Sequence, residues 1–473
     1  MADPKHIARD MVQSLDLATG RNGHIGLVRR YLKGDHDLPY MPKKGGSEEY
    51  LGIAKRSIEN WLPLVASTFT KTLFVDGYRV GKSEDNLPLW LIWQANGMDA
   101  RQTITHRGAI EYGTSYVVVR PGDPMPVITP LKARRTLAWY NDEDDDFPEA
   151  GLVWRGTDFD GNHVYELYYG PYVYTFVRRG SKEDRTLPND PMSTTDGPDR
   201  GARFGGLDLV ATEEHGMGNF VPWVRFRDRL DDEAAGLVRP LIPLQNHVNE
   251  AVFAKNMLLQ YEVFKQKWAT GVEIPRDTQE ELPDGSPNPN FGKPIEAYRA
   301  AVDRLWIAED PQARFGSFES GDIKGPVTAH DSAVDALAAI AEMSPALLRG
   351  NIENVPAEGF ATLADSMNKK RDELRTLFGE SWEQVFMLTA RAAGAEHDPS
   401  AEVSWRDTDP KSFEAVTQGL MNLYNMGAPS TELFELVPGM TEQRLQRWRD
   451  AADKPSEADK LLAAIERTTE TAE

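Results

Sequence analysis

Residues 239–268 read RPLIPLQNHVNEAVFAKNMLLQYEVFKQKW, and apolar side chains recur along them at the spacing of one helix face. These positions are Leu241, Leu244, Val248, Val252, Leu259 and Val263. A period of about 3.6 residues maintained over this length predicts one long helix covering 239–268. Pro240 and Pro243 suit its first turn, where a missing N–H breaks no hydrogen bond.

An interrupted segment and two more helices follow this helix. The stretch ELPDGSPNPNFGKP (281–294) is too rich in Pro and Gly for regular structure, although RLWIAE (304–309) and ARFGSFES (313–320) are strand-like. SAVDALAAIAEM (332–343) predicts a second helix that starts at a capping box of Ser332 and Asp335. We then expect a loop at LLRGNIENVPAEG (347–359) and a third long helix over 360–391.

Helices and then strands are predicted upstream. Residues 1–110 are mostly helical by apolar spacing, whereas short β-branched and aromatic runs between turn signals predict an antiparallel meander over 115–178. Residues 180–219 are polar and Gly-rich, so we expect a long loop there, followed by one more strand at 221–228. The predicted fold class is therefore α+β.

Composition excludes several kinds of site. The chain has no cysteine, hence no disulfide, thiolate metal site or cysteine nucleophile, and its nine histidines show no close ligand pairing. A formal net charge of −21 argues against a protein that grips DNA, because neutralising phosphates supplies the affinity of such proteins. No apolar run reaches the roughly 20 residues of a membrane helix and no signal peptide is visible, so we expect cytoplasmic synthesis and no membrane partner.

Sequence signatures of catalysis are also missing. The string nearest to a phosphate-binding loop, GSPNPNFGK (285–293), has the wrong spacing, and Pro294 replaces the required Ser or Thr. The acidic run Asp142–Asp146 alternates carboxylates as an EF-hand loop does, but Phe147 stands where that loop needs Gly and Val153 where it needs Glu. A solvated loop and an adventitious cation site both remain open for this run. We predict no enzyme, no catalytic or metal site and no cofactor.

Six strings stand out in chain order: RRYLKGDHDLPYM (29–41), SIENWLPLVASTFTKTLFVDGYRV (57–80), LPLWLIWQANGMDARQTITHRGAIEYGTSYVVV (87–119), FGSFESGDIKG (315–325), AIAEMSP (339–345) and FGESWEQVF (378–386). Together with the order of the predicted elements, this set resembles the portal family of tailed bacteriophages, in the type found in phages of Gram-positive and actinobacterial hosts. The resemblance covers roughly 20–450, and its strength lies in the order of the strings more than in any one of them.

The resemblance implies a ring-forming portal fold whose parts follow a fixed order. They are a wing of helices and β meander (1–228), a first stem helix region (229–269), a small α/β clip (270–328), a second stem helix (329–345), a tunnel loop (346–359), a long helix returning through the wing (360–410), a helical crown (411–466) and a tail (467–473).

By the same resemblance the protein is structural and lies at the portal vertex of the virion. It would form a homo-oligomeric ring of twelve subunits that conducts double-stranded DNA without sequence specificity during packaging, retention and ejection. The partners implied are the terminase large subunit, the head–tail adaptor that later replaces it, the major capsid protein and, as a further candidate, a scaffold protein.

Three groups of site residues follow from this reading. The DNA-facing tunnel-loop positions are Arg349, Asn351, Glu353, Asn354 and Glu358. Contacts of the clip with a partner or a neighbouring subunit are assigned to Trp306, Ile307, Phe315 and Phe318. Packing of the stem helices is assigned to Val248, Val252, Leu259, Val334, Leu337 and Ala341.

Each assignment has a plainer alternative. The loop can be a solvated surface loop, the clip strands can form a hairpin within one subunit, and Trp306 can be an ordinary core residue. For the whole chain, the alternatives are another structural ring protein of the virion and a metal-dependent nuclease.

Overall fold

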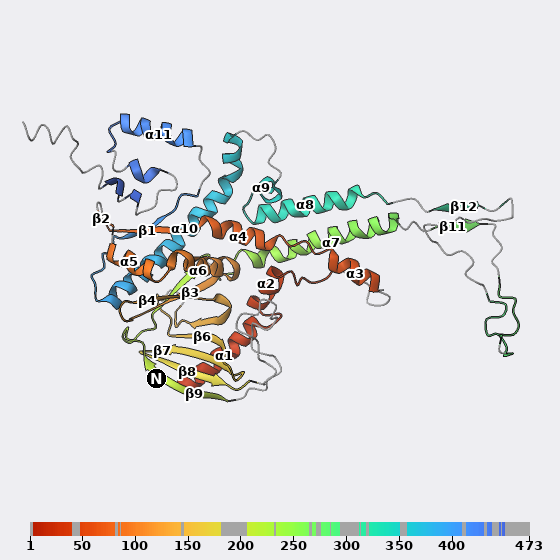
Figure 1. The fold of residues 1–473 in the computed structure, drawn as a ribbon, viewed down its shortest axis with the longest axis horizontal. Helices are drawn as coiled ribbons and strands as arrows, with labels where there is room; N and C mark the ends of the chain where they lie inside the picture. Colours follow the sequence, from red (N-terminus) through yellow and green to blue (C-terminus); the bar gives the residue numbers. More distant parts are fainter. Residues whose placement is uncertain are drawn as a thin grey trace, which may run out of the picture. The chain divides into compact units, whose positions relative to one another are not determined.

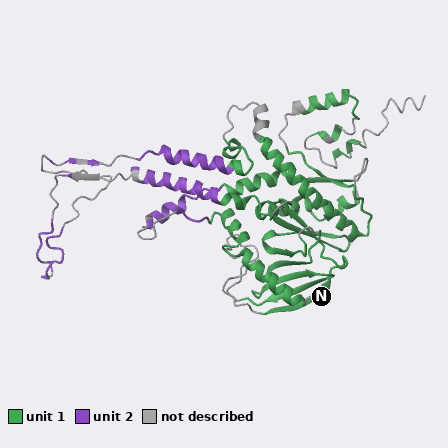
Figure 2. Cartoon of the chain, turned by 180° about the vertical axis from the view of Figure 1, so that it is seen from behind, with its two compact units in different colours: residues 1–35, 61–242, 338–473 green, residues 36–60, 243–337 purple. Residues whose placement is uncertain are grey.

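The structure is a computed structural model, and contacts within it divide the chain into two compact units (Figure 2). Unit 1 comprises residues 1–35, 61–242 and 338–473, and unit 2 comprises residues 36–60 and 243–337. The residues that the structure describes are 3–39, 48–80, 84–85, 87–142, 146–180, 206–230, 233–263, 267–270, 276–283, 285–293, 312, 314–317, 321–350, 357–408, 413–429, 433–437, 444–445 and 447–449.

The largest sheet of unit 1 is antiparallel with the strand order β5-β6-β7-β8-β9 (Figure 1). Its strands are β5 (Thr136–Trp139), β6 (Ala150–Thr157), β7 (His163–Tyr169), β8 (Tyr172–Arg178) and β9 (Leu207–Glu214). The predicted meander is confirmed for β5 to β8. The predicted loop over 180–219 is wrong for β9, which pairs with β8 along its length. Because β9 is a largely exposed edge strand, its sequence lacks the apolar alternation of a half-buried strand.

Helix α1 (Pro4–Thr19) covers one face of this sheet. Ile7, Met11 and Leu15 recur every four residues and so share the helix face that packs on Leu152 and Tyr165. The helix begins at Asp3, whose carboxylate accepts the backbone N–H of Lys5 at 3.0 Å.

The other face of the sheet packs against a second sheet with the order β10-β3-β4. Its strands are β3 (Thr114–Arg120), β4 (Val127–Leu131) and β10 (Trp223–Arg227), and the 3-10 turn η1 (Ala133–Arg135) leads from β4 to β5. Trp223 and Tyr116 of this sheet lie against Tyr168 and Val153 of the first. The predicted single meander over 115–178 is therefore split, since β3 and β4 pair with the later strand β10 and β5 to β8 form a separate sheet.

The helical core of unit 1 surrounds α10, a helix of 37 residues (Ala357–Ala393). The other helices are α2 (His24–Leu32), α4 (Leu62–Thr72), α5 (Leu87–Ala95) and α6 (Met98–Tyr112). Trp382 of α10 is fully buried, edge-on to Trp93 at 4.9 Å and to Phe226 at 4.7 Å between ring centroids. This aromatic cluster joins α10 to α5 and β10. The spacing of apolar residues on α10 predicts a buried face but does not predict which elements pack against it.

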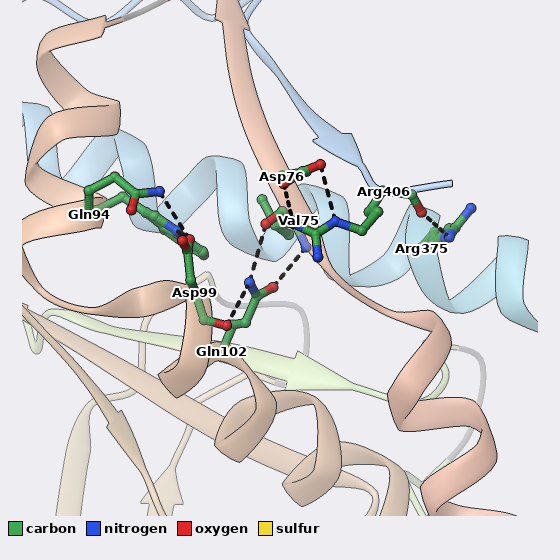
Figure 3. Close-up of polar contacts among 8 residues, drawn as sticks. Val75, Asp76, Gln94, Asp99, Gln102, Arg375 and Arg406 are labelled. Atoms are coloured by element: carbon green, nitrogen blue, oxygen red, sulfur yellow. Dashed lines mark hydrogen bonds and ion pairs between the residues drawn. The ribbon is translucent and has the colours of Figure 1, made fainter. Parts of the chain in front are cut away.

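A third small sheet, ordered β13-β1-β2, ties the chain after α10 back to its N-terminal part. Its strands are β1 (Val75–Val80), β2 (Glu84–Asp85) and β13 (Glu402–Trp405). Gln102 of α6 accepts the N–H of Val75 at 2.7 Å and donates to its carbonyl at 3.2 Å (Figure 3). Next to it Arg406 forms a bidentate pair with Asp76 at 2.7 and 3.2 Å, while Arg375 donates to the carbonyl of Arg406.

The chain after β13 is helical where the structure describes it. It contains α11 (Phe413–Asn425) and the 3-10 turn η3 (Phe434–Leu436). The predicted helical nature of 411–466 is confirmed for these segments, and 450–473 lie outside the described residues.

Unit 2 holds most of two long helices, α7 (Val238–Val263) and α8 (Lys324–Ile340), which run alongside each other in both views (Figures 1 and 2). It also contains α3 (Glu48–Arg56) and a two-stranded ladder of β11 (Lys267–Thr270) and β12 (Arg314–Ser317). The predicted helix over 239–268 is wrong at its end, because residues 267–270 form β11 and pair with β12.

Candidate functional site

The two long helices carry all but one of the stem-packing residues predicted from sequence; the exception, Ala341, is buried and directly follows the end of α8. On α7, Val248 is fully buried and Val252 nearly so, whereas Leu259 is 41% exposed. On α8, Val334 and Leu337 are fully buried. The predicted apolar face is thus buried in the middle of each helix, whereas Leu259, nearer the end of α7, is partly exposed.

Polar side chains hold the segment before Trp61 against α7. Asn249 is 1% exposed, and its Oδ1 accepts the N–H of Glu59 at 3.1 Å. Its amide nitrogen lies 2.9 Å from Nδ1 of His36. Gln245, one turn earlier and fully buried, donates to the carbonyl of Glu59 and to Asn249 Oδ1. We call Gln245, Asn249, His36 and Glu59 the stem clamp.

Helix α8 approaches the same segment through His330. His330 Nε2 lies 3.4 Å from Glu59 Oε2, and His330 Nδ1 lies 3.3 Å from Asp331 Oδ1. Glu59 therefore contacts α7 through its backbone and α8 through its carboxylate. The sequence analysis missed the stem clamp, although two amides one turn apart on an otherwise apolar helix face signal a buried hydrogen-bond network.

Helix α8 begins earlier than predicted. It starts at Lys324, whose N–H is accepted by Asp322 Oδ1 at 2.9 Å, so the predicted capping box at Ser332 and Asp335 is wrong. Asp322 as the capping residue and Pro326 in the first turn predict a helix start as well as the capping box at Ser332 and Asp335 does, and they lie farther upstream.

The junction that leads into α7 is close-packed and needs glycine. A Cβ on Gly113 would lie 2.4 Å from the carbonyl oxygen of Ala234, and one on Gly236 would lie 2.7 Å from that of Glu111. Both glycines have positive φ, 87° and 73°. The carboxylate of Asp228 accepts the N–H of Gly236 at 3.1 Å, and burial raises the pKa of this carboxyl although Arg229 opposes the shift.

The predicted tunnel loop contains a helical turn. Residues Pro345–Arg349 form α9, which ends at Gly350 with φ of 68°, and α10 begins at Ala357. Arg349 is exposed in the last turn of α9, and Glu358 lies in the first turn of α10. The first and last residues of the segment 346–359 are therefore helical, in α9 and α10. The positions Asn351, Glu353 and Asn354 lie outside the described residues.

Charges of both signs lie on the helices that flank this loop. Lys370 Nζ lies 3.7 Å from Glu342 Oε1 and 2.9 Å from Glu373 Oε2, so it connects the end of α8 with α10. Lys369 pairs with Asp365 at 2.8 Å. With these lysines already opposed by carboxylates, the described flanks offer no concentrated basic surface for phosphate.

Comparison with protein families agrees with this order of elements. A family described as "Phage portal protein, SPP1 Gp6-like" matches residues 21–458, which is nearly the whole chain. The chain belongs to the phage portal protein family. It is accordingly a subunit of the portal vertex of a phage capsid, and the α+β portal fold predicted from sequence is confirmed.

Solved structures that match the portal chain are distant in sequence. A chain in a structure titled "Neck of empty GTA particle computed with C6 symmetry" is 12% identical, with a TM-score of 0.43, covering 89% of this chain and 95% of the other. A chain in "Virion of native gene transfer agent (GTA) particle" is 12% identical, with a TM-score of 0.42, covering 88% and 100%. No curated protein matches the sequence.

The clip of the portal is partly described. Strands β11 and β12 pair antiparallel within one chain, with Phe315 opposite Ala269. This ladder joins β12 to a strand more than 40 residues earlier in the chain, so it does not test the alternative of a hairpin between 304–309 and 313–320. The predicted positions Trp306, Ile307 and Phe318 lie outside the described residues, as does the strand predicted at 304–309.

Nothing in the described part of the portal forms a metal or membrane site. Among the residues described, no group of three or more His, Asp and Glu is placed to hold a metal ion. Asp142 and Asp146 are exposed, and the rest of that acidic run lies outside the described part. No helix among the described residues is both long and apolar enough to cross a bilayer.

Proposed function

We propose that this portal subunit assembles into a homo-oligomeric ring, of twelve copies in the virion, that conducts double-stranded DNA during packaging, retention and ejection. The observation that carries the proposal is the pair α7 and α8, held to one segment by the stem clamp, in a chain of the portal family. A closed ring of identical subunits needs heterologous contacts, in which one surface of each subunit binds a different surface of the next. Two long helices that lie side by side, such as α7 and α8, suit the wall of its channel.

The acidic net charge of the subunit is consistent with sequence-independent passage of DNA. The chain carries a formal net charge of −21, and a lining that neutralises few phosphates binds DNA weakly and lets it slide. We assign DNA contact to the tunnel loop, where Arg349 is the basic residue among polar and acidic ones. The chain supplies no catalytic step in this proposal, so a separate terminase provides the energy.

The remaining parts take the roles that the family order assigns. The clip (270–328) docks the terminase large subunit and later the head–tail adaptor, and the crown (411–466) faces the packaged DNA. The wing contacts the major capsid protein and, during assembly, a scaffold protein. We assign residues 36–60, which the sequence analysis grouped with the wing, to the stem in this proposal; their membership of unit 2 together with most of α7 and α8 supports that choice.

Imaging of the purified full-length protein tests the proposal. Cryo-electron microscopy should show closed rings with a central channel lined by 243–263 and 324–337. Monomers at high protein concentration, or rings whose channel is lined by other elements, would contradict it. Absence of nucleotide or DNA turnover by the same sample is the expected result for a structural subunit.

A further inference from the structure

Helix α11, in the segment assigned to the crown, lies in a stretch without charge. Residues 415–431 (AVTQGLMNLYNMGAPST) contain no Asp, Glu, Lys or Arg, although these types make up 27% of the chain. A surface helix normally carries charged or polar side chains on the face that meets water. Interfaces, in contrast, are depleted of charged residues at their centre and enriched in Met and Tyr. Met421 and Tyr424 lie in this stretch, so its composition is that of a covered surface.

The described side chains of α11 are nevertheless all at least partly exposed, from Val416 to Asn425. Tyr424 is 62% exposed and Leu423 39%. Together with Val416 and Leu420 they recur at the spacing of one helix face, which we call the α11 face. A helix of 13 residues has little stability in water by itself and depends on packing of its apolar side. The α11 face therefore needs an element that covers it.

The described chain after α11 ends within reach of this helix. Phe434 starts η3 nine residues after Asn425, so the two lie at most about 32 Å apart. Trp448 packs edge-on against Phe434, with 5.3 Å between ring centroids. The chain from Trp448 to Leu461 can span about 45 Å when extended. Residues from 461 onward can therefore reach α11 of their own subunit.

A segment with a complementary apolar face begins there. Residues 458–467 read ADKLLAAIER and lie outside the described residues, and the sequence predicts them to be helical as far as 466. In a helix Leu461, Leu462 and Ile465 fall on one side, within an arc of about 100°, and the charged residues fall on the opposite side. Such a helix can bury its apolar side on the α11 face and turn its charges to the water.

We propose that residues 458–467 fold as a helix on the α11 face of the same subunit, with their three large apolar side chains against Leu423 and Tyr424. The linker 450–457 is short, and a tether of this length gives an effective concentration in the millimolar range, which favours the same chain over a neighbouring copy. DNA is a poor occupant, because the stretch 415–431 has no basic residue to neutralise a phosphate. The contact goes beyond the proposed role in DNA passage and does not depend on it, since it forms within one subunit.

Cysteine cross-linking in the full-length protein tests this inference, because the chain has no cysteine of its own. Y424C is combined in turn with L461C, L462C or I465C, and each pair is oxidised mildly. At least one pair should form a disulfide within one chain, seen as a monomer on a denaturing gel and as joined peptides by mass spectrometry. Q418C with the same three partners is the matched control. Gln418 is exposed on the opposite side of α11 and should cross-link at least about tenfold more slowly.

Each outcome decides the matter. Disulfide-linked dimers would place the segment on a neighbouring copy and overturn the proposal, and so would absence of a disulfide or equal rates for the Tyr424 and Gln418 pairs. If the cysteine variants fold poorly, L462S/I465S serves instead. It should speed hydrogen exchange of the amides of 416–425 about tenfold, whereas K460S, on the charged side, should not. Unchanged exchange overturns the proposal. Failure of the wild-type protein to form rings would contradict the proposed function and leave this result standing, because both readouts work on a monomer.

Discussion

Trp382 donates its indole N–H to Nε2 of His106 across 2.8 Å, and both side chains are fully buried. Nδ1 of the same imidazole lies 3.2 Å from the carbonyl of Leu73, which can only accept. His106 must therefore be neutral, with its proton on Nδ1, to satisfy both neighbours. Burial lowers the pKa of His106 to about 3, in keeping with this geometry.

Acid should destabilise unit 1 through this histidine. Its pKa is near 6.5 when unfolded and about 3 when folded, so the unfolded chain binds more protons between these values. The free energy of unfolding should fall as the pH drops from 6.5 toward 3, by about 1.4 kcal/mol per pH unit. H106Q should be less stable at pH 7 and lose stability less steeply below pH 6.5. Urea unfolding of the wild-type protein and H106Q from pH 7 to 4.5 measures how steeply the free energy of unfolding depends on pH in each. The exposed-residue variant His6→Gln is the control. Equal slopes for wild type and H106Q would rule out the role of His106.

Arg375 should be more important for stability than the exposed ion pairs. Its side chain, 16% exposed, donates to the carbonyl of Arg406 at 2.8 Å (Figure 3). It also donates to the carbonyl of Thr72 at 2.9 Å, and so joins α10 to the residue after β13 and to the end of α4. R375A removes the donor of these two partly buried carbonyls and should cost about 2 kcal/mol. The control R21A removes an exposed pair at 3.4 Å and should cost under about 0.5 kcal/mol. Equal thermal midpoints for the two variants would refute this ranking.

Asn249→Leu should loosen the stem clamp while keeping side-chain volume. It removes the acceptor of the Glu59 N–H and the partners of Gln245 and His36, and each buried group left unpaired costs about 1–3 kcal/mol. We expect faster hydrogen exchange in 57–60 and poorer ring formation. Glu250→Ala changes the next, exposed residue of α7 and should behave as wild type. Unchanged protection of 57–60 in N249L would mean that the clamp does not hold this segment.

Local signals were enough to predict much of the fold. Apolar periodicity located α7 and α10, and β-branched runs with turn residues located β5 to β8. Element ends were less predictable, because β11 is helix-compatible in sequence and becomes a strand by pairing with β12. The exposed edge strand β9 was missed, since a strand with so few buried residues shows no apolar alternation.

The stem residues show the same limit of sequence reasoning. Val248 and Val334 could be predicted as buried from helix spacing, since that signal is local. The stem clamp could not, because His36 and Asn249 are far apart in sequence and meet only in the folded unit. Exposure of Tyr424 could not be predicted for a similar reason, as nothing in its local sequence distinguishes an exposed aromatic residue from a buried one.

Neutralising Arg349 should affect DNA handling more than assembly. This exposed residue lies in the last turn of α9 and is the first of the predicted DNA-facing positions. Around a ring, the substitution removes one positive charge from every subunit, and affinity for DNA falls when fewer phosphates are neutralised. In R349A phage we expect normal rings but genome retention reduced about tenfold, which corresponds to about 1.4 kcal/mol. R349K retains the charge and should retain most function, and K369A removes a basic residue already paired with Asp365 and should be silent. The readout is the fraction of DNA-filled capsids after mild heating, together with titre. Normal titre and DNA content in R349A would show that Arg349 does not contact the passing genome.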